Sequence, residues 1–223
     1  MNSEKPKLDD DFPGHASNGL AGLLDLAKKY KQDEVFNKLI EKTQATWRYL
    51  RKIPKGPNRA REVHGIIDSY IAETVGEKSI SCKKACSFCC YQQVIVTEDE
   101  ADLLLEAKVD IDLKRLERQA KIEEEERIEK PKAWSSPPRN ETRCVFLDLD
   151  KKTCRVYDRR PAACRKYMVV TPPEGCRDPK GISQVLTNHG AEIVASAHMN
   201  CSPTTTLPKA LYAKLHKSEL LNS

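Results

Sequence analysis

The sequence contains no long hydrophobic run. No stretch approaches the roughly 18 uncharged apolar residues that a membrane-spanning helix needs. The first residues, MNSEKPKLDDDFPGH, also lack the apolar segment of a signal peptide. We therefore expect no membrane contact and a cytoplasmic protein, whose thiols are kept reduced.

The sequence also lacks a strong excess of one charge. Its 38 basic and 33 acidic residues are mixed along the chain and leave a net charge of +5. So small an excess argues against nucleic acid as a partner. With 39% hydrophobic and 32% charged residues among 223, the composition indicates a soluble protein with a modest core, long enough for one sizeable domain or two small ones.

Cysteine, in contrast, is abundant and concentrated. Four of the nine cysteines lie in the stretch CKKACSFCC, residues 82–90. An odd number of cysteines and a reducing compartment both disfavour a disulfide framework. Scattered buried cysteines could account for one or two of the nine, but not for four in so short a stretch. Three interpretations remain: metal ligands, redox thiols or a catalytic nucleophile.

Hydrophobic periodicity predicts a mainly α-helical fold with one small β-hairpin, organised by metal in its cysteine-rich part. Three amphipathic helices are expected before residue 76, with IPKGPN at residues 53–58 as a break. The later helices are expected after a capping box of Thr97 and Glu100, as a solvated helix over 112–130, from Ile182 to Ala197, and after Pro203. Two apolar runs within residues 144–158 predict the hairpin.

These elements suggest four consecutive parts of the chain. They are a disordered N-terminus (1–16), a helical preface (17–76), a cysteine-cluster metal-binding domain (77–202) and a C-terminal helix (203–223). The first part is polar and contains two prolines, which is typical of disorder. The helical preface is most simply a scaffold.

The spacing within CKKACSFCC suits metal chelation. Cys82 and Cys86 are four residues apart and Cys86 and Cys89 are three apart, which brings their sulfur atoms to one side of a helical turn or tight loop. Thiolates so placed can chelate one zinc or iron ion. Side chains of adjacent residues diverge by about 100° on a helix and about 180° on a strand. We therefore expect Cys90 to face a second site or to stay free.

The other five cysteines lie downstream: Cys144, Cys154, Cys164, Cys176 and Cys201. Cys144 and Cys154 sit on the two arms of the expected hairpin, where a regular register places both on one face. Cys164 is expected just inside a helix with Asp158 as its N-cap, where the helix dipole stabilises a thiolate. Arg160 and Arg165 beside it could offset thiolate charge or bind an anionic cofactor, or could simply be surface charges.

These motifs together resemble a known family. CKKACSFCC followed by CVFLDLDKKTCRVYDRRPAACRKY is similar to the YkgJ-like cysteine-cluster family of zinc- or iron-chelating proteins. That family has a box ending in CC, a later cysteine, and the motif C-x-(I/V)-Y-x-x-R-P-x-x-C-R, which runs here from Cys154 to Arg165. The resemblance covers residues 82–170 and implies metal chelation, with Cys176 or Cys201 as a further ligand. It supplies no agreed biochemical role, although related flagellin lysine-N-methylases suggest a link to protein methylation.

Other interpretations use the same cysteines. CKKACSFC also matches the box of radical S-adenosylmethionine enzymes, with Phe88 as its aromatic residue, and would make the protein an iron–sulfur enzyme. Those enzymes resemble partial (β/α) barrels, whereas residues 69–81 offer at best one short strand and no glycine-rich segment lies near the box. Redox thiols would need a thioredoxin-like βαβ unit around Cys86 and Cys89, which the pattern lacks.

Two further alternatives stay open. His198 lies three residues before Cys201, so the pair could share a metal, although a histidine on a helix face is the simpler interpretation. A Cys–His nucleophile is also open, since the chain has five histidines. A structural zinc module that binds a protein partner is the strongest non-enzyme alternative.

The sequence therefore predicts a cysteine-ligated metal centre. Its prime ligands are Cys82, Cys86, Cys89 and Cys164. Further members, in the same or an adjacent site, are Cys90, Cys144 and Cys154, with Cys176 or Cys201 completing it. Zinc is favoured by tetrahedral thiolate chemistry, and iron, for example in a 4Fe–4S cluster, is the alternative. Whether the protein is an enzyme stays open.

Overall fold

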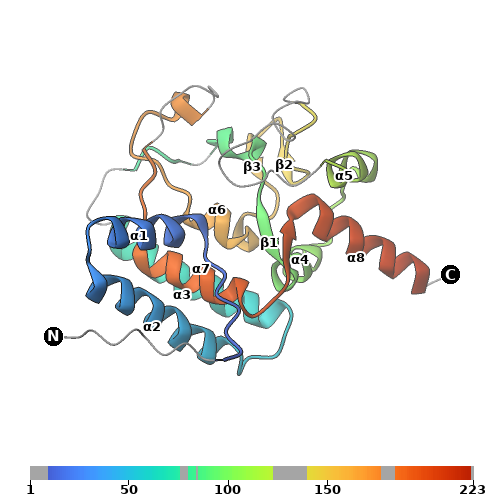
Figure 1. The fold of residues 1–223 in the computed structure, drawn as a ribbon. Helices are drawn as coiled ribbons and strands as arrows, with labels where there is room; N and C mark the ends of the chain where they lie inside the picture. The colour runs from blue at the N-terminus through green and yellow to red at the C-terminus, as the bar shows by residue number, and fades with distance from the viewer. Residues whose placement is uncertain (1–9, 76–79, 84, 123–139, 177–183, 222–223) are drawn as a thin grey trace.

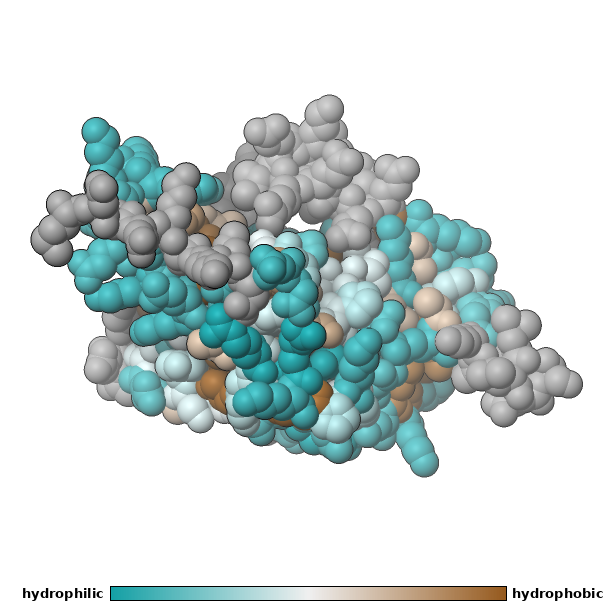
Figure 2. Space-filling model, turned by 60° about the horizontal axis from the view of Figure 1, so that its bottom comes forward, coloured by the Kyte–Doolittle hydropathy of each residue, from teal (hydrophilic) through white to brown (hydrophobic). Residues whose placement is uncertain are grey.

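The fold is described from a computed structural model of the chain. The description covers residues 10–75, 80–83, 85–122, 140–176 and 184–221. The fold is mainly α-helical with small antiparallel β-structure, which confirms the predicted fold class. No helix in these ranges is long and apolar enough to span a bilayer. On the face shown in Figure 2, hydrophilic side chains cover most of the surface and hydrophobic ones show only in small areas.

Four helices pack side by side in one part of the molecule (Figure 1). They are α1 (Asn18–Lys29), α2 (Asp33–Leu50), α3 (Pro57–Val75) and α7 (His189–Met199). The three expected N-terminal helices are thus present, and α7 joins them from far along the chain. Their shared core includes Trp47, Leu50, Val63, Ile67, Ala191 and Val194. Residues before and after the cysteine-rich box therefore share one hydrophobic core.

The start of α7 differs from the helix expected from Ile182. Ile182 lies outside the described residues, and Val185 forms an isolated antiparallel bridge with Val169. The helix begins at His189 because the side chain of Asn188 accepts a hydrogen bond from the backbone N–H of Ala191. The expected helix therefore begins too early.

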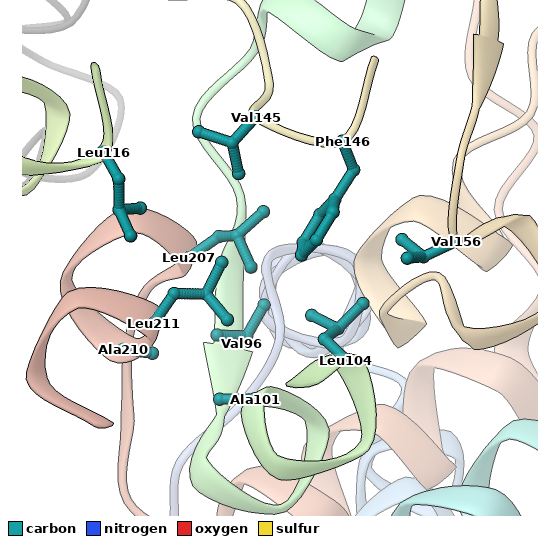
Figure 3. Close-up of a cluster of buried hydrophobic side chains, with 10 residues drawn as sticks. All are labelled: Val96, Ala101, Leu104, Leu116, Val145, Phe146, Val156, Leu207, Ala210 and Leu211. Carbon is teal, nitrogen blue, oxygen red and sulfur yellow. The ribbon is translucent and has the colours of Figure 1, made fainter. Parts of the chain in front are cut away.

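A second group of elements packs beside the helical bundle. It contains α4 (Glu98–Leu105), α5 (Leu113–Ala120) and α8 (Leu207–Leu221). Figure 3 shows its core, formed by Val96, Ala101, Leu104, Leu116, Val145, Phe146, Val156, Leu207, Ala210 and Leu211. The expected charged helix is only partly solvated, because Leu116 is fully buried in this core. Residues 123–130 of that expected helix lie outside the described residues.

The β-structure consists of two small antiparallel sheets in the described part of the chain. The expected hairpin is formed by β2 (Leu147–Asp148) and β3 (Thr153–Cys154). A second sheet, which the sequence did not predict, pairs β1 (Ile95–Thr97) with β4 (Thr204–Thr206). Both sheets are two-stranded, so the described residues contain nothing like a (β/α) barrel of the radical S-adenosylmethionine type.

Four short elements complete the fold: η1 (Phe88–Tyr91), η2 (Tyr157–Arg159), α6 (Ala162–Lys166) and η3 (Pro173–Cys176). The expected capping of a helix by Asp158 is wrong. Asp158 lies inside η2, and α6 begins only after Pro161. The proline ring fixes the backbone there and separates the two helical turns.

A buried polar network lies between the helical bundle and the second core. Its members come from α3, β1, α4 and α7: Arg59, His64, Thr97, Asp99, Glu100 and His198. Each of these residues is at most 4% exposed. So many buried polar groups are tolerated only when they are hydrogen-bonded to one another or to the backbone.

Asp99 anchors one half of this network. Its Oδ1 accepts a hydrogen bond from the backbone N–H of Gly56 at 2.7 Å. Its Oδ2 accepts one from Arg59 Nε at 2.6 Å and lies 3.1 Å from His198 Nε2. Burial alone would raise the pKa of Asp99, but the hydrogen bonds from His198 and Arg59 outweigh it and hold the pKa at about 2. The carboxylate thus stays ionised inside the protein.

Glu100 anchors the other half. Its Oε2 accepts from the backbone N–H of Thr97 at 2.9 Å, which closes the predicted capping box of α4. Its Oε1 accepts from the backbone N–H of Ala162 at 2.7 Å and lies 3.2 Å from His64 Nε2. Burial opposes ionisation, yet these bonds hold the pKa of Glu100 at about 2. Glu100 therefore fixes the start of α6 against α3 and α4.

We predict that Asp99→Ala destabilises the protein by about 3 to 5 kcal/mol, because it leaves the buried Arg59 without its ionic partner. Urea denaturation measures the change. Glu98→Ala, an exposed carboxylate on the same turn, is the control and should change stability by less than about 0.5 kcal/mol. Equal effects of the two substitutions would show that the network does not hold the fold.

Acid should weaken the fold in two steps. Burial lowers the pKa of His64 below its usual 6.5, so below that pH the unfolded chain takes up a proton that folded His64 resists, and stability falls. The depressed pKa values of Asp99 and Glu100 add a second loss below about pH 4, where unfolded carboxylates protonate first. Denaturation curves across this range should show both steps. His64→Gln should flatten the first step alone, and an unchanged first step would contradict the assignment.

Candidate metal centre

Eight of the nine cysteines lie close enough for a charge on one to act on others. We call them the cysteine cluster: Cys82, Cys86, Cys89, Cys90, Cys144, Cys154, Cys164 and Cys176. They come from the loop before η1, from η1 itself, from the loop before β2, and from β3, α6 and η3. All eight are free thiols. The fold therefore gathers thiols from segments that are far apart in sequence.

The backbone brings these segments together. Ala85 has a φ of 67°, a left-handed conformation that reverses the chain between Cys82 and Cys86. The N–H of Cys144 donates to the carbonyl oxygen of Cys90 at 2.8 Å, which ties the residues before the hairpin to η1. The Sγ of Cys82 accepts from the N–H of Val169 at 3.4 Å. The cluster is thus positioned by main-chain contacts as well as by side chains.

Cys89 lies at the centre of the cluster. One group of neighbours acts on Cys82 and consists of Cys86, Cys89 and Cys176. A second group acts on Cys90 and consists of Cys89, Cys144 and Cys164, with Cys154 close to Cys144 and Cys164. The cluster therefore has two overlapping parts that meet at Cys89.

Cys89 and Cys90 do not diverge as neighbours on a regular helix or strand would. The Cys90 thiol donates a hydrogen bond to Cys89, and this bond, with the charge of Arg160 nearby, lowers the pKa of Cys89 to about 7 although burial opposes it. The same bond, together with burial, raises the pKa of Cys90. Cys89 is therefore the thiol of the pair that loses its proton first.

The remaining thiols resist ionisation as long as no cation is near. Burial raises the pKa of Cys144 to about 12 and also raises those of Cys82 and Cys154. Burial and then the neighbouring thiolates raise the pKa of Cys164. The expected stabilisation of a Cys164 thiolate by a helix dipole is therefore outweighed. A cation placed among these sulfur atoms would reverse the balance.

The donor set fits zinc or iron in its chemistry. Soft thiolates are the ligands of structural zinc and of iron–sulfur clusters. The geometry is less complete: within the described ranges, no three His, Cys, Asp or Glu side chains are arranged to hold a metal ion. The fold thus brings the thiols into one neighbourhood without closing them around one point.

The two arginines beside Cys164 have different roles. Arg165 is 7% exposed, and its guanidinium donates to Asp68 Oδ2 at 2.5 Å, to the carbonyl oxygen of Arg160 at 2.9 Å and to that of Asp158. These bonds close the turn around η2, so the expectation that Arg165 binds an anionic cofactor is not supported. Arg160 faces the thiols instead, and its charge lowers the pKa values of Cys89 and Cys154 against burial.

Cys201 lies apart from the cluster. Its Sγ is 3.8 Å from the carbonyl oxygen of Trp47, and it packs against the core of the helical bundle. His198 belongs to the buried polar network with Thr97 and Asp99, so the structure does not pair it with Cys201 around a metal. Of the two downstream candidates, Cys176 is therefore the one that lies with the other thiols.

Sequence reasoning missed the polar network. Thr97 and Glu100 were recognised only as a capping box, and His64 was given no role. One signal was present: His64 falls on the same helical face as Ala60 and Ile67, a face that is otherwise apolar. A histidine on a buried face needs a partner, but the sequence alone does not name a partner so far along the chain.

Comparison with known proteins bears on the cysteine-rich part of the chain. No curated protein and no solved structure matches the chain. A family model named CxxCxxCC matches residues 81–182, and its description reads "Putative zinc- or iron-chelating domain". The matched segment contains the whole cysteine cluster and leaves out Cys201. In this segment, the chain is similar to a family of metal-chelating domains.

Proposed function

We propose that the protein binds zinc or iron through thiolates of the cysteine cluster. The observation that carries this proposal is the gathering of eight thiols from distant segments around Cys89. A fold that needed only buried apolar groups would not concentrate groups whose ionisation is mutually unfavourable. The match of residues 81–182 to a zinc- or iron-chelating family supports the same conclusion.

The cluster provides enough ligands for two four-thiolate sites. One set would be Cys82, Cys86, Cys89 and Cys176, and the other Cys90, Cys144, Cys154 and Cys164. This division follows the two overlapping groups of neighbours. It also gives Cys90 the second site that its position beside Cys89 suggested. Four thiolates complete a tetrahedral shell for zinc and equally suit a cysteine-ligated iron–sulfur cluster.

Arg160 is suited to balance the charge of such a centre. Four thiolates around a divalent ion leave a net negative charge. The guanidinium of Arg160 lies 4.0 Å from the centre of the Tyr157 ring, and its buried Nε has no hydrogen-bond partner. Its charge already acts on Cys89 and Cys154. The unpaired N–H would then donate to a metal-bound sulfur, which is a role for Arg160 in place of binding a separate anionic cofactor.

The proposed role of the metal is to close the cluster. It would draw η1, η3 and the loop before β2 into one fixed arrangement in the cytoplasm, and the finished surface could then bind a protein partner. We favour zinc, because tetrahedral thiolate binding needs no further component. A colourless protein containing zinc supports this choice, whereas a brown protein containing iron and sulfide would favour the iron–sulfur alternative.

Single cysteine substitutions test the division into two sites. Cys90→Ser should lower the metal bound by about half, because it removes a ligand from one site of two. Cys82→Ser should lower it by a similar fraction through the other site. Elemental analysis of anaerobically purified protein measures both. Cys201→Ser is the matched control and should keep the full metal content; loss of metal in this variant would contradict the proposed ligand sets.

Removing the metal should loosen only part of the matched segment. We expect a chelator to increase hydrogen exchange in residues 80–91 and 173–176, which contain little buried apolar surface. The hairpin should keep its protection, because Val145, Phe146 and Val156 are buried in the second core. Hydrogen-exchange mass spectrometry with and without chelator distinguishes the regions. Equal protection of 80–91 in both states would mean that the metal does not order this segment.

A further inference from the structure

A pocket of about 500 Å³ lies between the end of α2, the loop 51–56 and the end of α7. We call it the Trp47 pocket. Its floor is built from buried side chains, since Trp47, Arg59 and Asn200 are 3%, 2% and 9% exposed. Trp47 Nε1 donates to the carbonyl oxygen of Asn200, and Arg59 Nη2 to that of Cys201, each at 3.1 Å. The pocket therefore has a fixed floor and a volume typical of small-molecule sites.

The walls of this pocket are basic. They carry three cationic side chains, Arg51, Lys52 and Lys55. Arg59 in the floor is neutralised from behind by Asp99, so the three wall residues set the local charge. Among the described residues that line the pocket, Asp11 is the acidic one. The walls thus carry more positive charge than the protein itself neutralises there.

Asp11 occupies the pocket from outside its walls. It belongs to residues 10–16, which precede α1, and it forms an ion pair with Arg51. The two side chains are 63% and 50% exposed, so this pair lies in water and contributes little to stability. The guanidinium of Arg51 is held 4.5 Å from the centre of the Trp47 ring, which keeps it oriented when Asp11 leaves.

The segment that carries Asp11 is anchored on both sides of the pocket. Phe12 contacts Trp47 edge-on with ring centres 5.2 Å apart. The backbone of His15 exchanges two hydrogen bonds with the Asn200 side chain, at 2.8 and 2.7 Å. Disorder was expected throughout residues 1–16, and this expectation is wrong for 10–16; residues 1–9 lie outside the described residues. Asp11 is thus held near Arg51 by contacts that do not depend on their ion pair.

We propose that the Trp47 pocket binds a small molecule carrying a phosphate group, and that Asp11 takes the place of this group when the ligand is absent. A doubly charged phosphate matches three cations better than a single carboxylate does. The planar guanidinium of Arg51 suits phosphate oxygens. Trp47, Ile53 and Pro54 provide apolar surface for the rest of the ligand. The site contains no member of the cysteine cluster and is independent of the proposed metal function.

Phenyl phosphate is a suitable probe, because it joins a phosphate to one ring. Isothermal titration of the full-length, metal-loaded protein should show saturable binding that weakens as salt is added. Arg51→Gln, and separately the double change Lys52→Gln with Lys55→Gln, should each weaken binding at least about fivefold. All three side chains are exposed, so the fold should tolerate both variants. Lys42→Gln, an exposed lysine of α2 outside the pocket, should leave binding unchanged.

Asp11→Asn provides the most specific test. Because it removes the competing carboxylate, it should strengthen binding of phenyl phosphate by about two- to fivefold. Absence of saturable binding in both the natural protein and Asp11→Asn overturns the proposal. Binding that survives both pocket variants, or that falls equally in Lys42→Gln, also overturns it. Weaker binding in Asp11→Asn would show that Asp11 supports the ligand instead of standing in for it, and would overturn that part.

Discussion

The fold depends on the burial of two adjacent carboxylates, Asp99 and Glu100, at the start of α4. Neighbouring residues on a helix point in different directions, so two buried acids in sequence must find partners on two different sides. Asp99 faces the loop before α3 and the end of α7, and Glu100 faces the start of α6. Each carboxylate therefore joins elements that share no local sequence, and the helical bundle and the second core are fixed relative to each other.

This constraint reaches the cysteine cluster through α6. Glu100 accepts a hydrogen bond from the backbone of Ala162, two residues before Cys164. Arg165, the residue after Cys164, is held by Asp68 of α3 and by carbonyl groups of η2. Cys164 is thus placed by bonds on both sides of it. The cysteines of η1 and η3 have no comparable polar anchors among the described residues, and we expect them to be the parts that adjust to a metal.

The sequence predicted those features that depend on nearby residues. The capping box of Thr97 and Glu100, the three N-terminal helices and the hairpin all follow from short spacings, and all are present. The features it missed are long-range. The pairing of β1 with β4 joins two three-residue strands, and nothing in the sequence near either strand identifies the other. The polar network escaped for the same reason, because its histidines and carboxylates lie on separate helices.

The candidate site shows the same division between what is local and what is not. The spacing of CKKACSFCC and the cysteine motif ending at Arg165 were sufficient to name the thiols, but not to choose between Cys176 and Cys201. That choice depends on where the chain returns after α6, and the structure places Cys176 in η3 beside η1 and Cys201 beneath Trp47. Cys201 could not join the cluster without leaving the core that packs α7 against α2. A thiol's position in the packed core, and not its spacing along the chain, therefore decides whether it can reach a metal.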